Sequence, residues 1–237
     1  MMASWTLLIR ATRSAWPSVF RSTRPWENPA MASSGSDPIR FWFDFASPFA
    51  YFAVPGIAEL AARHGRKIEW RPTLLWAVFK AQGIAAPLDV PGRKAYLFAD
   101  IDRSAAFYRM PLAKPVKIPF SSHLAGRLFY GLTAEKPEMA ADFVRAVLER
   151  FFARGEEITS LSALQDVMGA LGLDPARTEA LIAAGRDALG AAVDEAVADG
   201  VIGSPFTMID GEGFFGVDRL PQIAWRLANG RPNGENT

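Results

Sequence analysis

Residues 39–49 read Ile-Arg-Phe-Trp-Phe-Asp-Phe-Ala-Ser-Pro-Phe. The segment 39–45 is mostly aromatic with polar breaks, and this pattern predicts a buried β-strand. Ser47 and Pro48 then predict the start of a helix, because serine is a favoured N-cap and proline is tolerated at the first helical position. We therefore interpret this stretch as a strand that turns directly into a helix.

The elements that follow alternate at first and then become helical. The helix is predicted to run to about Arg63, and residues 67–71 are predicted to form a second strand. From residue 74 to about residue 200 the sequence carries helix signals and little that resembles a strand. Apolar residues at i, i+4 spacing in this region predict the core of a helical bundle. They are Phe143, Val144, Val147, Leu148, Phe151 and Phe152.

The C-terminal part of the chain returns to strand. Residues 206–210 and 214–215 flank Gly211-Glu-Gly213, which predicts a β-hairpin, and Asp218 is predicted to cap a closing helix. The order β-α-β, helices, β-β-α is that of an α/β, thioredoxin-like core with a large all-helical insertion. The predicted units are the core halves 37–73 and 201–230, the helical insertion 74–200 and a C-terminal tail 231–237.

Residues 1–36 are predicted to be an N-terminal extension outside the fold. They contain four arginines and one acidic residue, Glu27, among serines, threonines and tryptophans, a composition typical of a transit peptide. The alternative is a mis-assigned start, because Met31 opens a short polar segment directly before the first strand. We favour the second interpretation, and under either one we expect the extension to be disordered.

Composition excludes several classes of function. The chain contains no cysteine, which excludes disulfides, thiolate metal sites and a redox dithiol of its own. Of the two histidines, His64 is expected at a solvated helix end and His123 in a structural role, so we expect no metal site. The formal charge is +1, and about −2 without residues 1–36, so no nucleic-acid partner is expected. No run of 18 or more apolar residues is present, so we expect no membrane span.

Four motifs, in order along the chain, resemble those of one family. They are Phe43-Asp-Phe-Ala-Ser-Pro-Phe49, Trp70-Arg-Pro-Thr-Leu-Leu75 with Val78-Phe-Lys80, Gly200-Val-Ile-Gly-Ser-Pro205, and Phe215-Gly-Val-Asp-Arg-Leu220. Over about residues 39–229 the chain resembles 2-hydroxychromene-2-carboxylate isomerases, which are relatives of kappa-class glutathione transferases and of DsbA-like thioredoxin folds. The resemblance implies glutathione as the cofactor and a small aromatic molecule as the substrate.

The resemblance also implies which residues hold the middle of glutathione. Ser47 matches the family serine that faces the glutathione sulfur, and Pro48 and Phe49 complete that turn. Ser204 precedes Pro205, whose peptide bond is expected to be cis. In this family the backbone at that position pairs in antiparallel fashion with the cysteinyl part of glutathione.

The two ends of glutathione are assigned in the same way. Val217 and Asp218 match the helix start that holds the γ-glutamyl end, and Arg93 stands where relatives often carry a lysine near the glycyl carboxylate. Two positions depart from the family pattern. Trp76 replaces a common glycine and is expected to narrow the site, and Ile84 replaces a glutathione-binding asparagine found in many kappa-like relatives.

The residue types around Ser47 suit this chemistry. A helix N-terminus carries about half a positive charge and unpaired N–H groups, so it stabilises a sulfur anion, and the serine hydroxyl adds a donor. Because the chain has no cysteine, the thiol must come from outside, and glutathione supplies one. We therefore assign Ser47 as the catalytic hydrogen-bond donor to the thiolate. The alternative is that Ser47 is only a helix cap, worth about 1 kcal/mol.

The predicted function is that of a glutathione-dependent 2-hydroxychromene-2-carboxylate isomerase, in which the thiolate adds reversibly to a conjugated intermediate of aromatic degradation and allows cis-trans isomerisation. One alternative is a kappa-like glutathione transferase, and another is a non-catalytic thioredoxin-like binding module. Relatives are commonly dimers, so we expect a homodimer. We expect a cytoplasmic location, or a mitochondrial one if residues 1–36 are a transit peptide.

The N-terminal extension yields a first prediction. A chain that begins at Met31 should keep the melting temperature and activity of the full chain, since termini that do not dock on a core contribute little. Thermal unfolding followed by circular dichroism compares the two chains. A loss of several degrees in the shorter chain would contradict the prediction and show that the extension packs on the fold.

Overall fold

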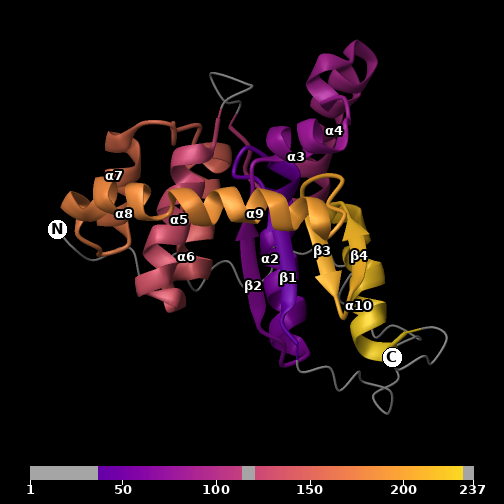
Figure 1. Cartoon of the computed structure of the whole chain (residues 1–237). Helices are drawn as coiled ribbons and strands as arrows, with labels where there is room; N and C mark the ends of the chain where they lie inside the picture. Colours follow the sequence, from indigo (N-terminus) through magenta and orange to yellow (C-terminus); the bar gives the residue numbers. More distant parts are fainter. Residues whose placement is uncertain (1–36, 114–120, 232–237) are drawn as a thin grey trace.

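The computed structural model describes residues 37–113 and 121–231. At its centre lies a four-stranded sheet with strand order β2-β1-β3-β4 (Figure 1). β1 runs parallel to β2, whereas the pairs β1–β3 and β3–β4 are antiparallel. The strands are β1 (Ile39–Phe43), β2 (Ile68–Pro72), β3 (Phe206–Ile209) and β4 (Glu212–Phe215). The predicted α/β class with a thioredoxin-like element order is confirmed.

Helices cover both faces of this sheet. Alternate residues of a strand point to opposite faces. Phe41 and Phe43 therefore join a large apolar cluster with α2 (Pro48–Arg63), whereas Trp42 packs in a second cluster with α9 (Arg186–Ala198). In Figure 1, α9 crosses one face of the sheet and α2 lies against the other. Burial on both faces explains why the first strand is a nearly continuous aromatic run.

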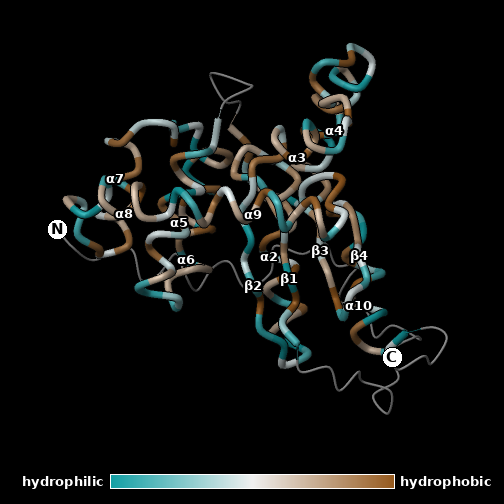
Figure 2. The backbone as a smooth tube through the Cα atoms, in the orientation of Figure 1, coloured by the Kyte–Doolittle hydropathy of each residue, from teal (hydrophilic) through white to brown (hydrophobic). Residues whose placement is uncertain are grey.

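Between β2 and β3 the described residues form helices and no strand, so the predicted all-helical insertion is confirmed. α4 (Pro91–Tyr108) stands out from the body in Figure 1, and hydrophobic and hydrophilic residues alternate along it in Figure 2. The remaining helices of the insertion are α3 (Leu75–Gln82), α5 (His123–Glu135), α6 (Ala140–Leu148), α7 (Leu161–Ala170) and α8 (Thr178–Ala184), with short 3₁₀ turns η3 (Pro87–Asp89), η4 (Pro137–Met139) and η6 (Pro175–Arg177).

The division of the chain into separate units stays a prediction. The extension 1–36 lies outside the described residues, as does the predicted tail beyond Arg231. The second half of the core ends in the 3₁₀ turn η7 (Val217–Arg219) and in α10 (Leu220–Asn229), which packs beside α2. Asp218 lies inside η7, and no side-chain cap is formed at the start of α10, so its predicted capping role is wrong.

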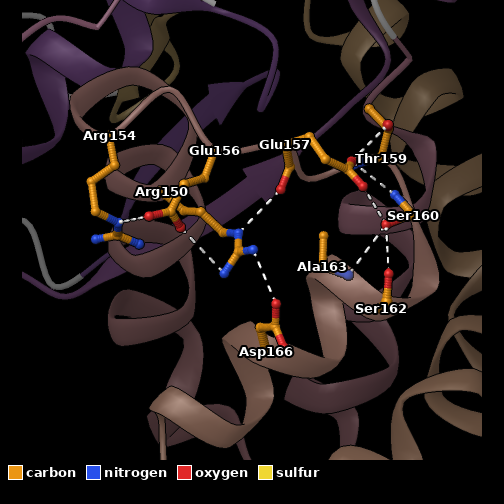
Figure 3. A network of polar contacts seen from close by, with 9 residues as sticks. All are labelled: Arg150, Arg154, Glu156, Glu157, Thr159, Ser160, Ser162, Ala163 and Asp166. Carbon is orange, nitrogen blue, oxygen red and sulfur yellow. Dashed lines mark hydrogen bonds and ion pairs between the residues drawn. The ribbon is translucent and has the colours of Figure 1, made fainter.

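The predicted apolar face of the bundle is buried throughout. The α-helix ends at Leu148, however, and continues as one π-helical turn, η5 (Glu149–Ala153), which periodicity did not predict. Arg150 on this turn contacts the carbonyl of Glu157 and the carboxylate of Asp166, as Figure 3 shows. This polar network ties the π turn to α7.

The predicted hairpin forms, with a shorter turn than expected. β4 begins at Glu212, so Glu212 and Gly213 belong to the strand. The turn consists of Asp210 and Gly211, whose φ angles are 50° and 79°. Two consecutive positive φ angles are typical of a type I′ turn, which favours the pair Asp-Gly because its twist matches that of the strands.

α5 and α8 approach so closely that the contact requires glycine. A Cβ atom added at Gly131 on α5 would clash with the backbone carbonyl of Leu181 on α8. In contrast, a Cβ atom added at Gly190 on α9 would meet no atom within 4 Å. Both glycines lie within helices. Substitution of each by alanine therefore changes helix propensity in the same way, and only Gly131 adds a clash between helices.

This contrast yields a prediction on stability. Gly131→Ala should lower the free energy of unfolding by about 1–3 kcal/mol, because backbone must shift to admit the methyl group. Gly190→Ala, the matched control, should raise it by about 0.5–1 kcal/mol, because alanine is the better helix former. Urea unfolding measures both changes. Equal effects at the two positions would contradict the packing explanation.

Candidate active site

The predicted site residues come from segments that meet at one edge of the sheet. β1 and β2 are parallel and end together, with Phe43 opposite Pro72. β3 begins and β4 ends at this same edge, since Phe206 lies opposite both Trp42 and Phe215. The turn after β1, the loop before β3 and the turn after β4 are therefore neighbours.

Ser47 is the N-cap of α2 and Pro48 is the first residue of that helix. The Ser47 hydroxyl accepts a hydrogen bond from the backbone N–H of Ala50 at 3.2 Å and donates one to the backbone carbonyl of Ser204 at 3.0 Å. The side chain is only 8% exposed. The hydroxyl thus sits where the helix N-terminus favours negative charge, and its one proton points to the loop before β3.

The loop before β3 is tied to both neighbouring segments. The peptide bond between Ser204 and Pro205 is cis, as expected. The Ser204 hydroxyl accepts a hydrogen bond from the backbone N–H of Asp44 at 3.0 Å, and the carbonyl of Pro205 accepts one from Gly216 at 2.9 Å. These bonds bring Ser47, Ser204 and Pro205 into one small group.

Val217 and Asp218 follow directly after Gly216 in η7. Val217 is buried, whereas the Asp218 carboxylate is exposed. Burial, together with the nearby charges of Asp218 and Asp100, raises the pKa of Tyr108 to about 12. The Tyr108 ring stacks on Phe52 of α2 with ring centroids 6.0 Å apart, and η7 itself packs against α2.

The aromatic residues near Ser47 differ in exposure. Phe49 is half-buried and makes an edge contact with Phe52, with ring centroids 6.3 Å apart. Phe79 is buried and belongs to the core. Trp76, in contrast, is 56% exposed and lies in the first turn of α3. Of these three aromatic residues, Trp76 is therefore the most accessible.

Arg93 lies in the exposed first turn of α4, the helix that stands out from the body (Figure 1). Within the described ranges, no contact links its side chain to Ser47, Ser204 or Asp218. Its assignment to the glycyl carboxylate stays a prediction. Ile84 follows α3 and is half-buried.

Asp44 is a site residue to which the sequence analysis assigned no role. Its buried carboxyl accepts hydrogen bonds from the N–H of Ala46 at 2.8 Å, the N–H of Leu75 at 2.9 Å and the hydroxyl of Ser122 at 2.5 Å. Burial raises the pKa of Asp44, and the three hydrogen bonds oppose that rise. An acidic residue at the end of an aromatic strand was the available signal, because buried carboxyls need partners.

The described residues hold neither a metal-ligand cluster nor a helix suited to a membrane. Over residues 37–113 and 121–231, no group of three or more His, Asp or Glu side chains is placed to hold a metal ion. None of the described helices is both long and apolar enough to cross a lipid bilayer.

Known proteins share this arrangement of elements. The family model described as the DSBA-like thioredoxin domain matches residues 38–228. The chain belongs to the DsbA-like thioredoxin family. A solved structure of 2-hydroxychromene-2-carboxylate isomerase resembles the DsbA-like fold of this chain with a TM-score of 0.70 at 27% identity, over 78% of this chain and 91% of that one.

Sequence relatives of this chain include enzymes of two kinds. The chain is 32% identical over 187 residues to 2-hydroxychromene-2-carboxylate isomerase of Sphingobium xenophagum, covering 77% of this chain and 93% of that protein. It is 27% identical over 205 residues to glutathione S-transferase kappa 2 of Caenorhabditis elegans, covering 80% and 91%. The family resemblance expected from the sequence motifs is confirmed.

Proposed function

We propose that this protein is a glutathione-dependent isomerase of the 2-hydroxychromene-2-carboxylate type. The observation that carries the proposal is the Ser47 hydroxyl at the start of α2, hydrogen-bonded to the backbone of the cis-proline loop, in a chain without cysteine. A thiolate can be stabilised at this position, and the protein has none of its own. Similarity to the isomerase of Sphingobium xenophagum supports this reaction.

Glutathione would exchange one hydrogen bond of Ser47 for another. A serine hydroxyl has one proton, and in the structure it is donated to the carbonyl of Ser204. In the antiparallel pairing implied by the family, the cysteinyl N–H of glutathione donates to that carbonyl. The Ser204 carbonyl then has a donor of its own, so the Ser47 hydroxyl can turn its proton to the sulfur without leaving that carbonyl unpaired, which couples cofactor binding to thiolate stabilisation.

The proposed reaction adds and removes the same thiolate. The sulfur forms a bond to one carbon of the conjugated double bond, and the displaced electron pair moves to the ketone oxygen as an enolate. The resulting carbon–carbon single bond rotates. The enolate electrons then re-form the double bond while the carbon–sulfur bond breaks, and glutathione returns unchanged.

Ser47 acts in this proposal as a donor and not as the attacking group. An alkoxide would need a general base beside it. His64 caps the opposite end of α2, which as a 16-residue helix is about 24 Å long. His123 pairs through Nδ1 with the Ser121 hydroxyl, and its pKa is lowered by burial and by Arg127. Neither histidine is therefore placed to act as a general base for Ser47.

The other assigned residues complete the proposed cofactor site. Val217 and Asp218 are proposed to hold the γ-glutamyl end, since η7 packs against α2 and follows Gly216, which bonds to the cis-proline loop. Arg93 is proposed to approach the glycyl carboxylate. Pro48 and Phe49 shape the turn around the sulfur. A homodimer and a cytoplasmic location, with a role in aromatic catabolism, are proposed on the resemblance alone.

A kappa-like transferase is the second candidate, because the kappa 2 protein of Caenorhabditis elegans matches 80% of this chain. The same thiolate would attack an electrophile and stay bonded to it. The two functions share Ser47 and the cofactor, and they differ only in the fate of glutathione.

Removal of the Ser47 hydroxyl tests its role. Ser47→Ala should still bind glutathione, while the pKa of the bound thiol rises and turnover at pH 7 falls by roughly tenfold to a thousandfold. Ser160→Ala is the matched control, because Ser160 caps α7 through the same hydrogen bond, at 3.2 Å to the N–H of Ala163. Both variants should lose about 1 kcal/mol of stability as caps.

Calorimetry with glutathione and initial rates at several pH values measure these effects. If Ser47→Ala keeps full activity at pH 7, Ser47 is only a helix cap and the proposed mechanism is wrong. If the unaltered protein binds no glutathione at millimolar concentration, the non-catalytic binding module becomes the better account.

The fate of glutathione separates the two enzymatic candidates. With 2-hydroxychromene-2-carboxylate as substrate, a catalytic amount of glutathione should support many turnovers, because the isomerase returns the thiol. The free thiol concentration is followed beside the absorbance of the substrate. Consumption of one glutathione per product molecule would instead support the transferase.

A further inference from the structure

Asp44 joins more segments of the candidate site than any other side chain described above. Through its carboxyl it contacts the Ser47 turn, the start of α3 at Leu75 and the start of α5 at Ser122. Through its backbone N–H it contacts the Ser204 hydroxyl in the cis-proline loop, and its carbonyl accepts the N–H of Ser47 at 2.9 Å. These contacts span partners up to 160 positions apart in sequence.

The carboxyl is also an ionisable group that contacts the Ser47 turn directly. Asp44 is 5% exposed and bonds to the N–H of Ala46, the residue before Ser47. An anion there opposes a second anion at Ser47, because like charges in a buried site disfavour one another. The N-terminus of α2 acts in the opposite direction. The acidity of a thiol at this position is the balance of the two.

We propose that Asp44 is a positioning residue that fixes the Ser47 turn against α3, α5 and the cis-proline loop, and that its charge sets how readily a thiol held at Ser47 loses its proton. The inference rests on the proposed function only in taking the thiol to be that of glutathione. The electrostatic coupling itself is a property of this chain.

Other charged groups do not explain the environment of Asp44. Among the described residues, no neighbouring charge contributes to its raised pKa, which reflects burial opposed by hydrogen bonds. His123 on α5 has a lowered pKa, so it is neutral near pH 7. On β2, Arg71 pairs with Glu69 and Glu195. Lys80 on α3 lies more than one turn beyond Leu75, and its side chain is exposed.

A single introduced thiol can report on this coupling without glutathione. Because the chain has no cysteine, Ser47→Cys provides the only thiol in the protein. The thiolate and not the thiol reacts with iodoacetamide, so the alkylation rate measured over roughly pH 4 to 10 gives the thiol pKa. The same measurement is made on Ser47→Cys combined with Asp44→Asn.

The matched control combines Ser47→Cys with Asp210→Asn. Like Asp44, Asp210 accepts hydrogen bonds through its carboxylate, here from the buried side chains of Arg66 and Arg226. It lies in the β3–β4 turn at the opposite edge of the sheet. Asp210→Asn therefore removes one negative charge, as Asp44→Asn does, but in a network outside the site. Circular dichroism and thermal unfolding verify that each variant is folded.

We expect Asp44→Asn to lower the pKa of the introduced thiol by about one pH unit, roughly a tenfold change in its ionisation constant, because the opposing charge is removed. Asp210→Asn should leave that pKa unchanged. A folded Asp44→Asn protein with the same thiol pKa as Ser47→Cys alone would overturn the proposal, even if its stability falls.

A second variant serves if Asp44→Asn does not fold. Asp44→Ser likewise removes the charge, while its side chain keeps an oxygen that can accept a hydrogen bond, so the thiol pKa should fall in the same direction. An unchanged thiol pKa in this variant would then overturn the proposal. Failure of the unaltered protein to bind glutathione would count against the proposed function alone.

Discussion

The antiparallel pairing of β1 with β3 is the interaction on which the site depends. The helical insertion separates the two strands in sequence, yet Trp42 lies opposite Phe206. This register places the turn after β1 against the loop before β3. The hydroxyls of Ser47 and Ser204 then cross the junction through hydrogen bonds of 3.0 Å each. Neither segment makes the site alone, because each supplies the partner of the other.

Burial of the sheet on both faces keeps that pairing rigid. Phe41 and Phe43 pack toward α2, and Trp42 packs toward α9, where its indole N–H also donates to Asp199 at 2.9 Å. A central strand held from both sides has little freedom to shift register. The polar groups at its end are therefore presented in one arrangement, which a site for a small thiol cofactor requires.

Much of the fold and part of the site could be predicted from local sequence. The aromatic strand, the serine cap followed by proline, and the presence of a hairpin between residues 206 and 215 each depend on residues within a few positions of one another. The π turn after Leu148 and the first residue of β4 were not predicted, because packing decides such details. No role could be assigned to Asp44 from local sequence, because its hydrogen-bond partners Leu75, Ser122 and Ser204 lie 31, 78 and 160 positions away.

The sequence by itself determined the element order, the absence of a thiol in the chain and the position of Ser47 at a helix start. These follow from composition and from local periodicity and capping. Only the tertiary structure decided that the Ser47 proton is donated to Ser204, that Asp44 lies buried beneath the same turn and that Arg93 is exposed on a projecting helix. Hydrogen bonds and burial between distant segments arise when the sheet closes, and no local pattern encodes them.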